Sequence, residues 1–431
     1  YSCRLYSQTL QTAQRSIHIF IIVRLFLFSG DEQLQNPVYR FINFLHPLTK
    51  EDIIKRELLF SEGDSIQLEL VEESMRNLRK LNFIGDVSIK IDSLSLSKVN
   101  LVVTTHDKST KGLRTNFNST GGLNKADLGY KDSNLMGMGI KVLVNYNYRS
   151  DRKNPHGTKI QFDDKRIFNS YWRSLFQYKN AEELNIQTLL FERIFYRENA
   201  NWAASIYGDK GKALDRIYKA GEVISEQSIS SQNISSWFSK SWGSKHKIRP
   251  ILFYSHNRST AKQLQLLPFE DIDFVGIGFN SLSRKFKTVR FIDQMGRMED
   301  QPTGYSTSFF IAPNVNRSSP TNYFSQIKLT TAFLFMDKFY SALDFSYIHF
   351  DIKNTPSNQT FGFKTHHYIK APFKQTIGVR TSLLVSKNGA ERQQIILGAT
   401  TGLRGYSAFE NSGSNRFIGN IENRDLPELD R

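Results

Sequence analysis

Cysteine is almost absent from this chain. Cys3 is the single cysteine among 431 residues, so the chain can form no internal disulfide and offers no cysteine-rich metal site. Long apolar segments are absent too. The longest, residues 17–28 (IHIFIIVRLFLF), contains Arg24 and is shorter than the roughly 20 residues that a membrane-spanning helix needs. The sequence therefore excludes a disulfide scaffold and a helical membrane protein.

Sequence motifs that support catalysis are also missing. No G-x-S-x-G nucleophile elbow occurs, and the glycines around Gly121 and Gly137 lack the strand-to-helix context and the lysine of a phosphate-binding loop. His366 and His367 are adjacent, so on a strand they face opposite sides and cannot bind one metal together. We therefore predict a protein that is not an enzyme, with no catalytic residue, metal or cofactor.

Acidic residues are outnumbered by basic ones. Lys and Arg total 57 and Asp and Glu total 41, which gives a net charge of +16. This excess permits an anionic partner such as a lipid surface. The basic residues are scattered through the chain rather than gathered in one stripe, so we expect no nucleic-acid partner.

The first quarter of the chain shows both helical and strand patterns. Residues 36–59 read as helical, with Thr49 as an N-cap and Asp52 three residues later. A second helix is predicted around residues 68–81, where apolar residues recur every three or four positions. Residues 87–91 and 99–103 alternate like strands, and the apolar run at residues 17–28 is taken as the opening strand. The order strand, helix, helix, strand, strand predicts a small α+β module over residues 17–107.

From about residue 111 onward, side chains alternate with a period of two. In residues 140–148 and 327–335 one face is apolar and the other polar. The 33 Phe and 18 Tyr and the mean hydropathy of −0.42 fit an outer-membrane β-barrel, with apolar residues toward lipid, aromatic girdles at both interfaces and a wet lumen. A soluble protein of several packed sheets remains the alternative.

Three segments carry a family resemblance. They are residues 56–91 (RELLFSEGDSIQLELVEESMRNLRKLNFIGDVSIKI), residues 131–139 (KDSNLMGMG) with Asn134, Leu135, Gly137 and Gly139, and the motif Leu403, Arg404, Gly405, Tyr406 followed by NRFIGNIENR. In this order they resemble the bacterial surface antigen family of outer-membrane assembly and secretion barrels, the BamA/TamA group. The first segment is similar to a POTRA module and the second to an early barrel turn.

The resemblance implies a role for the loop around residue 404. In the family this loop folds back into the barrel, and the arginine that matches Arg404 contacts a carboxylate on the inner wall. A guanidinium suits this contact because it stays charged and forks toward a carboxylate. Gly405 would allow the tight turn, and Tyr406 would pack the loop tip against the wall.

The resemblance also implies domain boundaries and a departure from the family pattern. We expect an unassigned segment at residues 1–16, a POTRA-like periplasmic module at 17–107, and a mostly β, antiparallel transmembrane barrel at 108–431. The family's later Asp-x-Gly motif and closing strand would lie beyond Arg431, so we expect this barrel to be C-terminally truncated. Glu422 and Arg424 are then candidate polar partners for Arg404. Some strand-like segments before Leu403 are expected to be hairpins outside the membrane or misassigned.

The expected function follows from the family. The chain would be an outer-membrane barrel of a Gram-negative bacterium that helps insert or translocate other polypeptides, with residues 112–120 on one side of a lateral seam. Its partners would be membrane lipid, unfolded outer-membrane polypeptides, and periplasmic or lipoprotein accessory factors. The alternative is a carrier barrel for a fused surface or secreted hydrolase whose catalytic domain lies upstream. A soluble adhesin or binding sandwich is a third reading.

Overall fold

The structure is a computed structural model, and the chain divides into two compact units. It describes residues 16–26, 36–38, 40, 44, 47–93, 95, 97–120, 122–197, 199–261, 271–290, 298–319, 321–353, 356–372, 375–388, 394–398, 401, 406 and 409–424. Unit 1 comprises Tyr1–Arg114, Gly129–Val144 and Gln161–Ser170, and unit 2 comprises Thr115–Leu128, Asn145–Ile160 and Tyr171–Arg431.

Unit 1 contains a three-stranded sheet with helices. Its elements are β1 (Ser16–Leu25), α4 (Glu51–Lys55), α5 (Leu68–Arg79), β2 (Ile84–Ser93) and β3 (Lys98–Asp107). The strand order is β1-β3-β2, with β1 parallel and β2 antiparallel to β3. The predicted order strand, helix, helix, strand, strand is therefore present. The apolar stripe of α5 and alternate residues of β3 meet in a core that includes Ile54, Leu78 and Leu101.

The predicted helix cap at Thr49 is wrong. Helix α4 has Lys50 as its N-cap, without a side-chain hydrogen bond. The backbone N–H and the hydroxyl of Thr49 instead both donate to Asp107 Oδ2, at 2.7 and 2.8 Å. Asp107 is 3% exposed at the end of β3, and a buried carboxylate needs donors more than an exposed helix end does.

One large sheet contains most of the remaining chain. Its order is β21-β18-β17-β16-β15-β14-β13-β12-β11-β10-β9-β8-β7-β6-β5-β4, and the neighbouring strands from β8 to β21 pair antiparallel. The strands are β4 (Lys111–Thr120), β5 (Leu123–Asp132), β6 (Ile140–Arg149), β7 (His156–Asp164), β8 (Arg173–Ala181), β9 (Leu184–Arg193), β10 (Trp202–Lys219), β11 (Glu222–Lys240), β12 (Lys247–Ala261), β13 (Ile272–Arg290), β14 (Met298–Pro313), β15 (Thr321–Phe335), β16 (Phe339–Ile352), β17 (Asn358–Lys370), β18 (Thr376–Lys387) and β21 (Asn415–Arg424).

Short elements complete the fold. Two 3-10 turns, η1 (Leu135–Gly137) and η2 (Ile167–Asn169), precede β6 and β8. A small hairpin, β19 (Ile395–Leu397) with β20 (Asn411–Gly413), lies between β18 and β21 in the chain. In the described part of the chain, no helix is both long and apolar enough to span a membrane.

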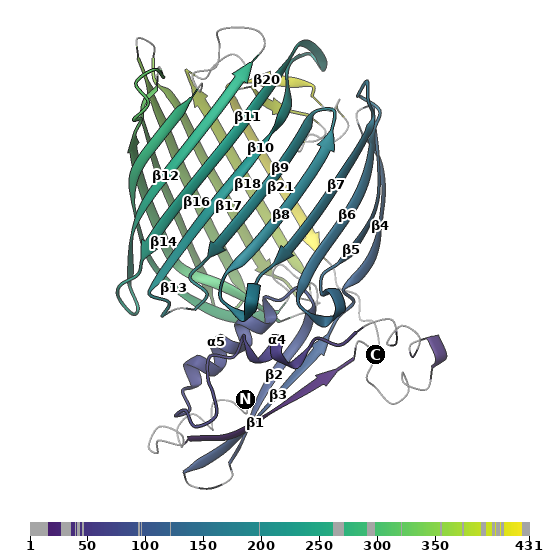
Figure 1. The fold of residues 1–431 in the computed structure, drawn as a ribbon, viewed down its shortest axis with the longest axis vertical. Coiled ribbons are helices and arrows are strands. Elements are labelled where there is room, and N and C mark those ends of the chain that lie inside the picture. Colours follow the sequence, from purple (N-terminus) through teal and green to yellow (C-terminus); the bar gives the residue numbers. More distant parts are fainter. Residues whose placement is uncertain are drawn as a thin grey trace. The chain divides into compact units, whose positions relative to one another are not determined.

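The sheet curls in unit 2, so that β16, β17 and β18 run behind β10, β11 and β12 (Figure 1). Ring contacts identify the inner face. Phe274 on β13 and Phe350 on β16 have ring centroids 6.4 Å apart, although two strands separate them and three strand spacings on a flat sheet would measure about 14 Å. Curvature toward these rings therefore brings them together.

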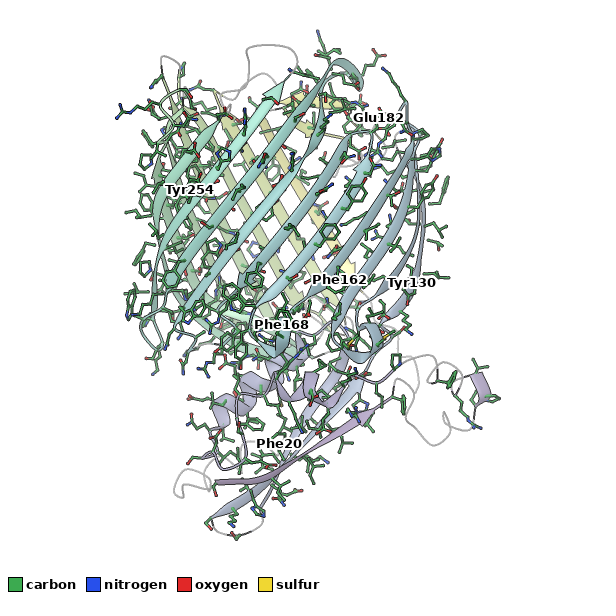
Figure 2. All side chains as sticks on the ribbon, viewed as in Figure 1. Phe20, Tyr130, Phe162, Phe168, Glu182 and Tyr254 are labelled. Atoms are coloured by element: carbon green, nitrogen blue, oxygen red, sulfur yellow. The ribbon has the colours of Figure 1, made fainter. Side chains whose placement is uncertain are left out.

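The opposite, outer face of unit 2 is apolar and exposed. The register aligns Phe238, Leu252, Ile277 and Ile311 in one row across β11 to β14, and their exposed fractions run from 37% to 63%. Tyr254 lies on the same face, further along β12 (Figure 2). Glu182 lies at the turn between β8 and β9 (Figure 2). Intervening residues such as Asp209 and Asn233 face inward and hydrogen-bond each other. The predicted two-residue alternation is therefore confirmed.

The expectation that some strand-like segments before Leu403 are misassigned is wrong, whereas the expectation that some lie outside the membrane stays a prediction. Every strand of the large sheet except β21 precedes Leu403, and all of them pair within that one sheet. None of these strands forms a hairpin separate from this sheet. The alternation that made the segments read as strands is the same alternation that gives each of them an apolar outer face.

Candidate functional site: the open sheet edges and the loop before the last strand

The turn before β6 is closed by a buried asparagine. Asn134 is 0% exposed, and its Oδ1 accepts a 2.6 Å hydrogen bond from the Gly139 N–H. Its Nδ2 donates to Thr49 Oγ1 at 2.8 Å, so the turn is joined to the Thr49–Asp107 pair within unit 1. An amide is required here because it donates and accepts at once.

Two glycines allow this turn to approach its neighbours closely. Gly137 and Gly139 both have a φ of 72°, and the Gly137 carbonyl accepts a 2.9 Å hydrogen bond from the Lys50 N–H. A Cβ at Gly137 would lie 2.3 Å from the Leu48 carbonyl oxygen. The predicted residues Asn134, Gly137 and Gly139 therefore share one polar turn, while Leu135 is half-buried beside them.

An ion pair that sequence reasoning missed lies in the same unit. The Arg166 guanidinium forks onto Glu57, with Nε–Oε1 and Nη2–Oε2 distances of 2.8 and 2.6 Å. Glu57 is 4% exposed, and a planar bidentate pair is the geometry that stabilises such a buried charge. Burial lowers the pKa of the neighbouring Arg56, and the negative charge of the Glu57 carboxylate opposes this lowering. The separation of 109 residues explains why sequence pattern gave no signal.

The predicted loop motif lies between β19 and β20. Leu403, Arg404 and Gly405 lie outside the described residues, whereas Tyr406 is described and is 50% exposed. The contact predicted for Arg404 therefore stays a prediction. The described residues on both sides of the motif do show how the β19–β20 segment is held.

This segment is anchored to the end of β10. The Gln394 amide accepts from the Tyr218 N–H at 2.8 Å and donates to the Tyr218 carbonyl at 2.9 Å. Ser412 donates to the same carbonyl, and the Phe409 and Tyr218 rings stack with centroids 4.1 Å apart. The pairing of β10 with β9 ends at Ala213, so Gln394 occupies a backbone edge that no neighbouring strand covers at Tyr218.

Glu422 and Arg424 lie together on the inner face of β21. The Arg424 guanidinium contacts Glu422 at 2.7 Å, and Arg380 on β18 contacts the same carboxylate at 3.4 Å. Arg380 Nε also donates to the Tyr368 hydroxyl at 2.9 Å. Glu422 therefore already has two arginine partners, and any contact with Arg404 would add to them. Sequence reasoning missed Tyr368 and Arg380 because their meeting depends on the register of β17 with β18.

The end strands of the large sheet have unusually exposed apolar residues. The strand order ends at β4 on one side and β21 on the other, and no pairing between these two is seen in the described chain. Leu113 and Phe117 on β4 are 81% and 73% exposed, and Phe417 and Ile421 on β21 are 66% and 82% exposed. Within the described residues each end strand has one backbone edge without a paired strand, beside apolar side chains, and an edge of this kind can pair with another extended chain.

Comparisons with known proteins give similarities of fold. No family model and no curated protein matches the chain. Among solved structures, BamA from Haemophilus ducreyi lacking POTRA domains 1–3 matches at 10% identity and TM-score 0.38, over 95% of this chain and 78% of that one. CdiB from Acinetobacter baumannii matches at 9% and 0.43 over 95% and 74%. CdiB from Escherichia coli matches at 10% and 0.40 over 95% and 76%. These matches assign no residue a role.

Replacing Gly137 with alanine tests the close approach in the turn. Gly137→Ala adds a clash with Leu48 to the strain of a left-handed residue, so we expect the free energy of unfolding of unit 1 to fall by about 2–4 kcal/mol. Gly63→Ala is the matched control, because Gly63 lies in the same unit and has a φ of 90° but no atom within 4 Å of the added Cβ. Urea unfolding read by amide exchange at Lys50 measures both, and equal losses would contradict the close-approach interpretation.

Replacing Gln394 tests the anchor on β10. Gln394→Ala removes both side-chain bonds to the Tyr218 backbone, so we expect the Tyr218 amide to exchange about 2- to 10-fold faster, as the loss of one net hydrogen bond implies. Hydrogen–deuterium exchange with mass spectrometry measures this rate. Gln375→Ala, at the other end of β18, serves as the control. Unchanged exchange at Tyr218 would show that the anchor does not depend on Gln394.

Proposed function

We propose that this protein is a non-enzymatic β-barrel of the outer membrane of a Gram-negative bacterium that helps insert or translocate other polypeptides. The observation that carries the proposal is the pair of end strands. β4 and β21 combine an unpaired backbone edge with the most exposed apolar residues of their sheet. The resemblance of residues 56–91, 131–139 and 403–406 to the bacterial surface antigen family supports the same function.

The outer face supports the membrane location. Exposure of apolar rows such as Leu252, Ile277 and Ile311 to water is unfavourable. Contiguous apolar patches on a protein surface mark a binding or membrane surface. In lipid the same rows are favourable, because strands of a barrel satisfy their backbone groups among themselves and bury apolar side chains outward. The polar inner face, with Asp209 and Arg380, then borders water.

The edges support a polypeptide partner. An unfolded chain that enters an apolar environment must pair its backbone N–H and C=O groups. A ten-residue edge such as β4 or β21 offers these groups in register, so a client can add as a strand. Under this proposal β4 and β21 border a lateral seam, and the β19–β20 segment with Arg404 acts as an internal latch near it.

Unit 1 receives a supporting role in the proposal. Residues 17–107 act as a POTRA-like periplasmic module, and the outer strands β1 and β2 of its sheet offer further edges to clients or to accessory factors. The alternative of a carrier barrel for a fused hydrolase gains no support from the described residues. Assembly or translocation therefore remains the function that the chain favours.

Site-specific crosslinking tests the edges. A photoreactive phenylalanine analogue at Phe117 or Phe417 should crosslink an unfolded outer-membrane polypeptide, because both side chains lie on end strands. Phe309 is the matched control, since it is 42% exposed on β14, which is paired on both sides. Gel analysis and mass spectrometry identify the products. Equal crosslinking at Phe309, or none at the two edges, would reject strand addition.

A charge added to each face tests the membrane location. Ile277→Arg places a cation on the exposed outer face, so folding into lipid vesicles should lose about 2–4 kcal/mol. Thr330→Arg is the control, because Thr330 faces inward and hydrogen-bonds Asp344, which can accept the new cation. The heat-dependent gel shift of the folded barrel reads both variants. Equal yields, together with release of the wild type from membranes by urea, would favour a water-soluble protein.

A further inference from the structure

All four tryptophans of the chain lie at one end of neighbouring strands. Trp172 precedes β8, Trp202 is the first residue of β10, Trp237 lies near the end of β11, and Trp242 follows β11 by two residues. Because neighbouring strands here are antiparallel, these starts and ends fall on the same rim of the sheet. Chance placement would scatter four tryptophans among sixteen strands and both rims.

The aromatic rings at this rim contact one another. Trp172 stacks on Phe191 with centroids 4.4 Å apart and meets Trp202 at 6.0 Å. Trp202 continues to Phe238 at 6.3 Å, and Tyr171 stacks on Tyr196 at 3.5 Å. We call the following residues the aromatic rim: Tyr171, Trp172, Phe191, Arg193, Tyr196, Arg197, Trp202, Phe238, Lys240 and Trp242.

Three cations of the rim lie over its rings. The Arg193 guanidinium is 3.8 Å from the Trp202 ring centroid, Arg197 is 5.5 Å from that of Tyr196, and Lys240 is 5.3 Å from that of Trp242. Among the described residues, no carboxylate lies within 4.0 Å of these three cations. Arg173, by contrast, faces inward and pairs with Glu192 at 2.7 Å. The described part of the rim therefore has three cations without a carboxylate partner.

The rim is continuous with the apolar outer face. Ala204 pairs with Arg193 on one side and Phe238 on the other, and Phe238 pairs in turn with Leu252. Arg193 therefore lies in the same row as the exposed outer residues, at the last position of β9. At this position the side chain of Arg193 lies between aromatic rings and the apolar outer face, and its charged guanidinium can extend toward water.

We propose that the aromatic rim binds the anionic headgroup of a phospholipid whose acyl chains lie on the adjoining outer face. The inference rests on the proposed membrane location and adds a preference for lipid charge. Two guanidiniums and one ammonium supply donors to phosphate oxygens, and the tryptophans suit the interfacial layer because each combines an apolar ring with an N–H donor.

The charge of the headgroup decides the preference. A zwitterionic headgroup brings its own cation, which the three rim cations repel, whereas an anionic headgroup has no cation and offsets part of their charge. The rings hold Arg193 and Arg197 in place before the lipid arrives, so little side-chain freedom remains to be lost on binding. A soluble anion would gain the phosphate contacts but would leave the apolar surface next to Phe238 and Leu252 uncovered.

Tryptophan fluorescence provides the test, since every tryptophan reports from this rim. The full chain is reconstituted in vesicles that contain brominated phosphatidylglycerol or brominated phosphatidylcholine at matched mole fractions. Bromine quenches tryptophan only on contact. We expect phosphatidylglycerol to quench at a several-fold lower mole fraction. Trp237→Phe removes the one tryptophan whose register position faces inward, opposite Phe253.

Charge removal identifies the site. The variant Arg193→Gln, Arg197→Gln, Lys240→Gln should lose the preference for the anionic lipid, about fivefold for each cation. The control Lys153→Gln, Lys219→Gln, Lys387→Gln removes three exposed cations at the opposite ends of the strands and should retain it. The pair Arg197→Gln, Lys240→Gln spares the partly buried Arg193 and serves if the triple variant does not fold.

The outcomes separate the two proposals. No quenching by either lipid would overturn the membrane location itself. Equal quenching by both lipids, or an anionic preference that survives removal of the rim cations, would overturn the headgroup site and leave the membrane location standing. A preference lost only in the rim variants would establish the site.

Discussion

The structure depends on one constraint, which is that backbone hydrogen-bonding groups must be paired wherever apolar side chains exclude water. The interior strands of the large sheet meet it by pairing on both sides, and their outer rows can therefore be apolar. The constraint is not met at β4 and β21 within the described chain, where the adjoining residues are nevertheless apolar and exposed. Under the proposed function, an extended polypeptide completes such an edge, so the constraint that builds the sheet would also select its partner.

Single side chains satisfy the constraint where strands end. Gln394 pairs with both backbone groups of Tyr218 beyond the last β9 partner, and Asn134 closes its turn by bonding Gly139 and Thr49. Both are amides, which offer separate donor and acceptor atoms in one plane. The described β19–β20 segment and the turn before β6 are thus held by the same chemistry. Such anchors can be released without unfolding a strand.

Local patterns in the sequence predicted the elements, and distant contacts escaped it. Alternation identified strands such as β15, and a three-to-four spacing identified α5, because both periods are properties of neighbouring residues. Thr49 was misassigned as a cap since its true partner, Asp107, is 58 residues away. The pairing of Gln394 with Tyr218 spans 176 residues, and the meeting of Arg380 with Glu422 depends on a register that one sequence does not display. Some strand-like segments before Leu403 were predicted to be misassigned because the family pattern places fewer strands there, although their own alternation indicated strands.

The strand order separates the aromatic rim from the open edges. The rim lies on β8 to β11, with β5, β6 and β7 between it and β4, and with β12 to β18 between it and β21. Strands in the middle of a sheet are paired on both sides, so lipid contacts there hold a region that has no need to open. The end strands have one paired side each and are cheaper to displace. Under the two proposals, a barrel fixed to lipid at its middle strands and loosely bounded at its ends would admit a client without losing its position in the membrane, because the displacement stays local to the edge that pairs with the client.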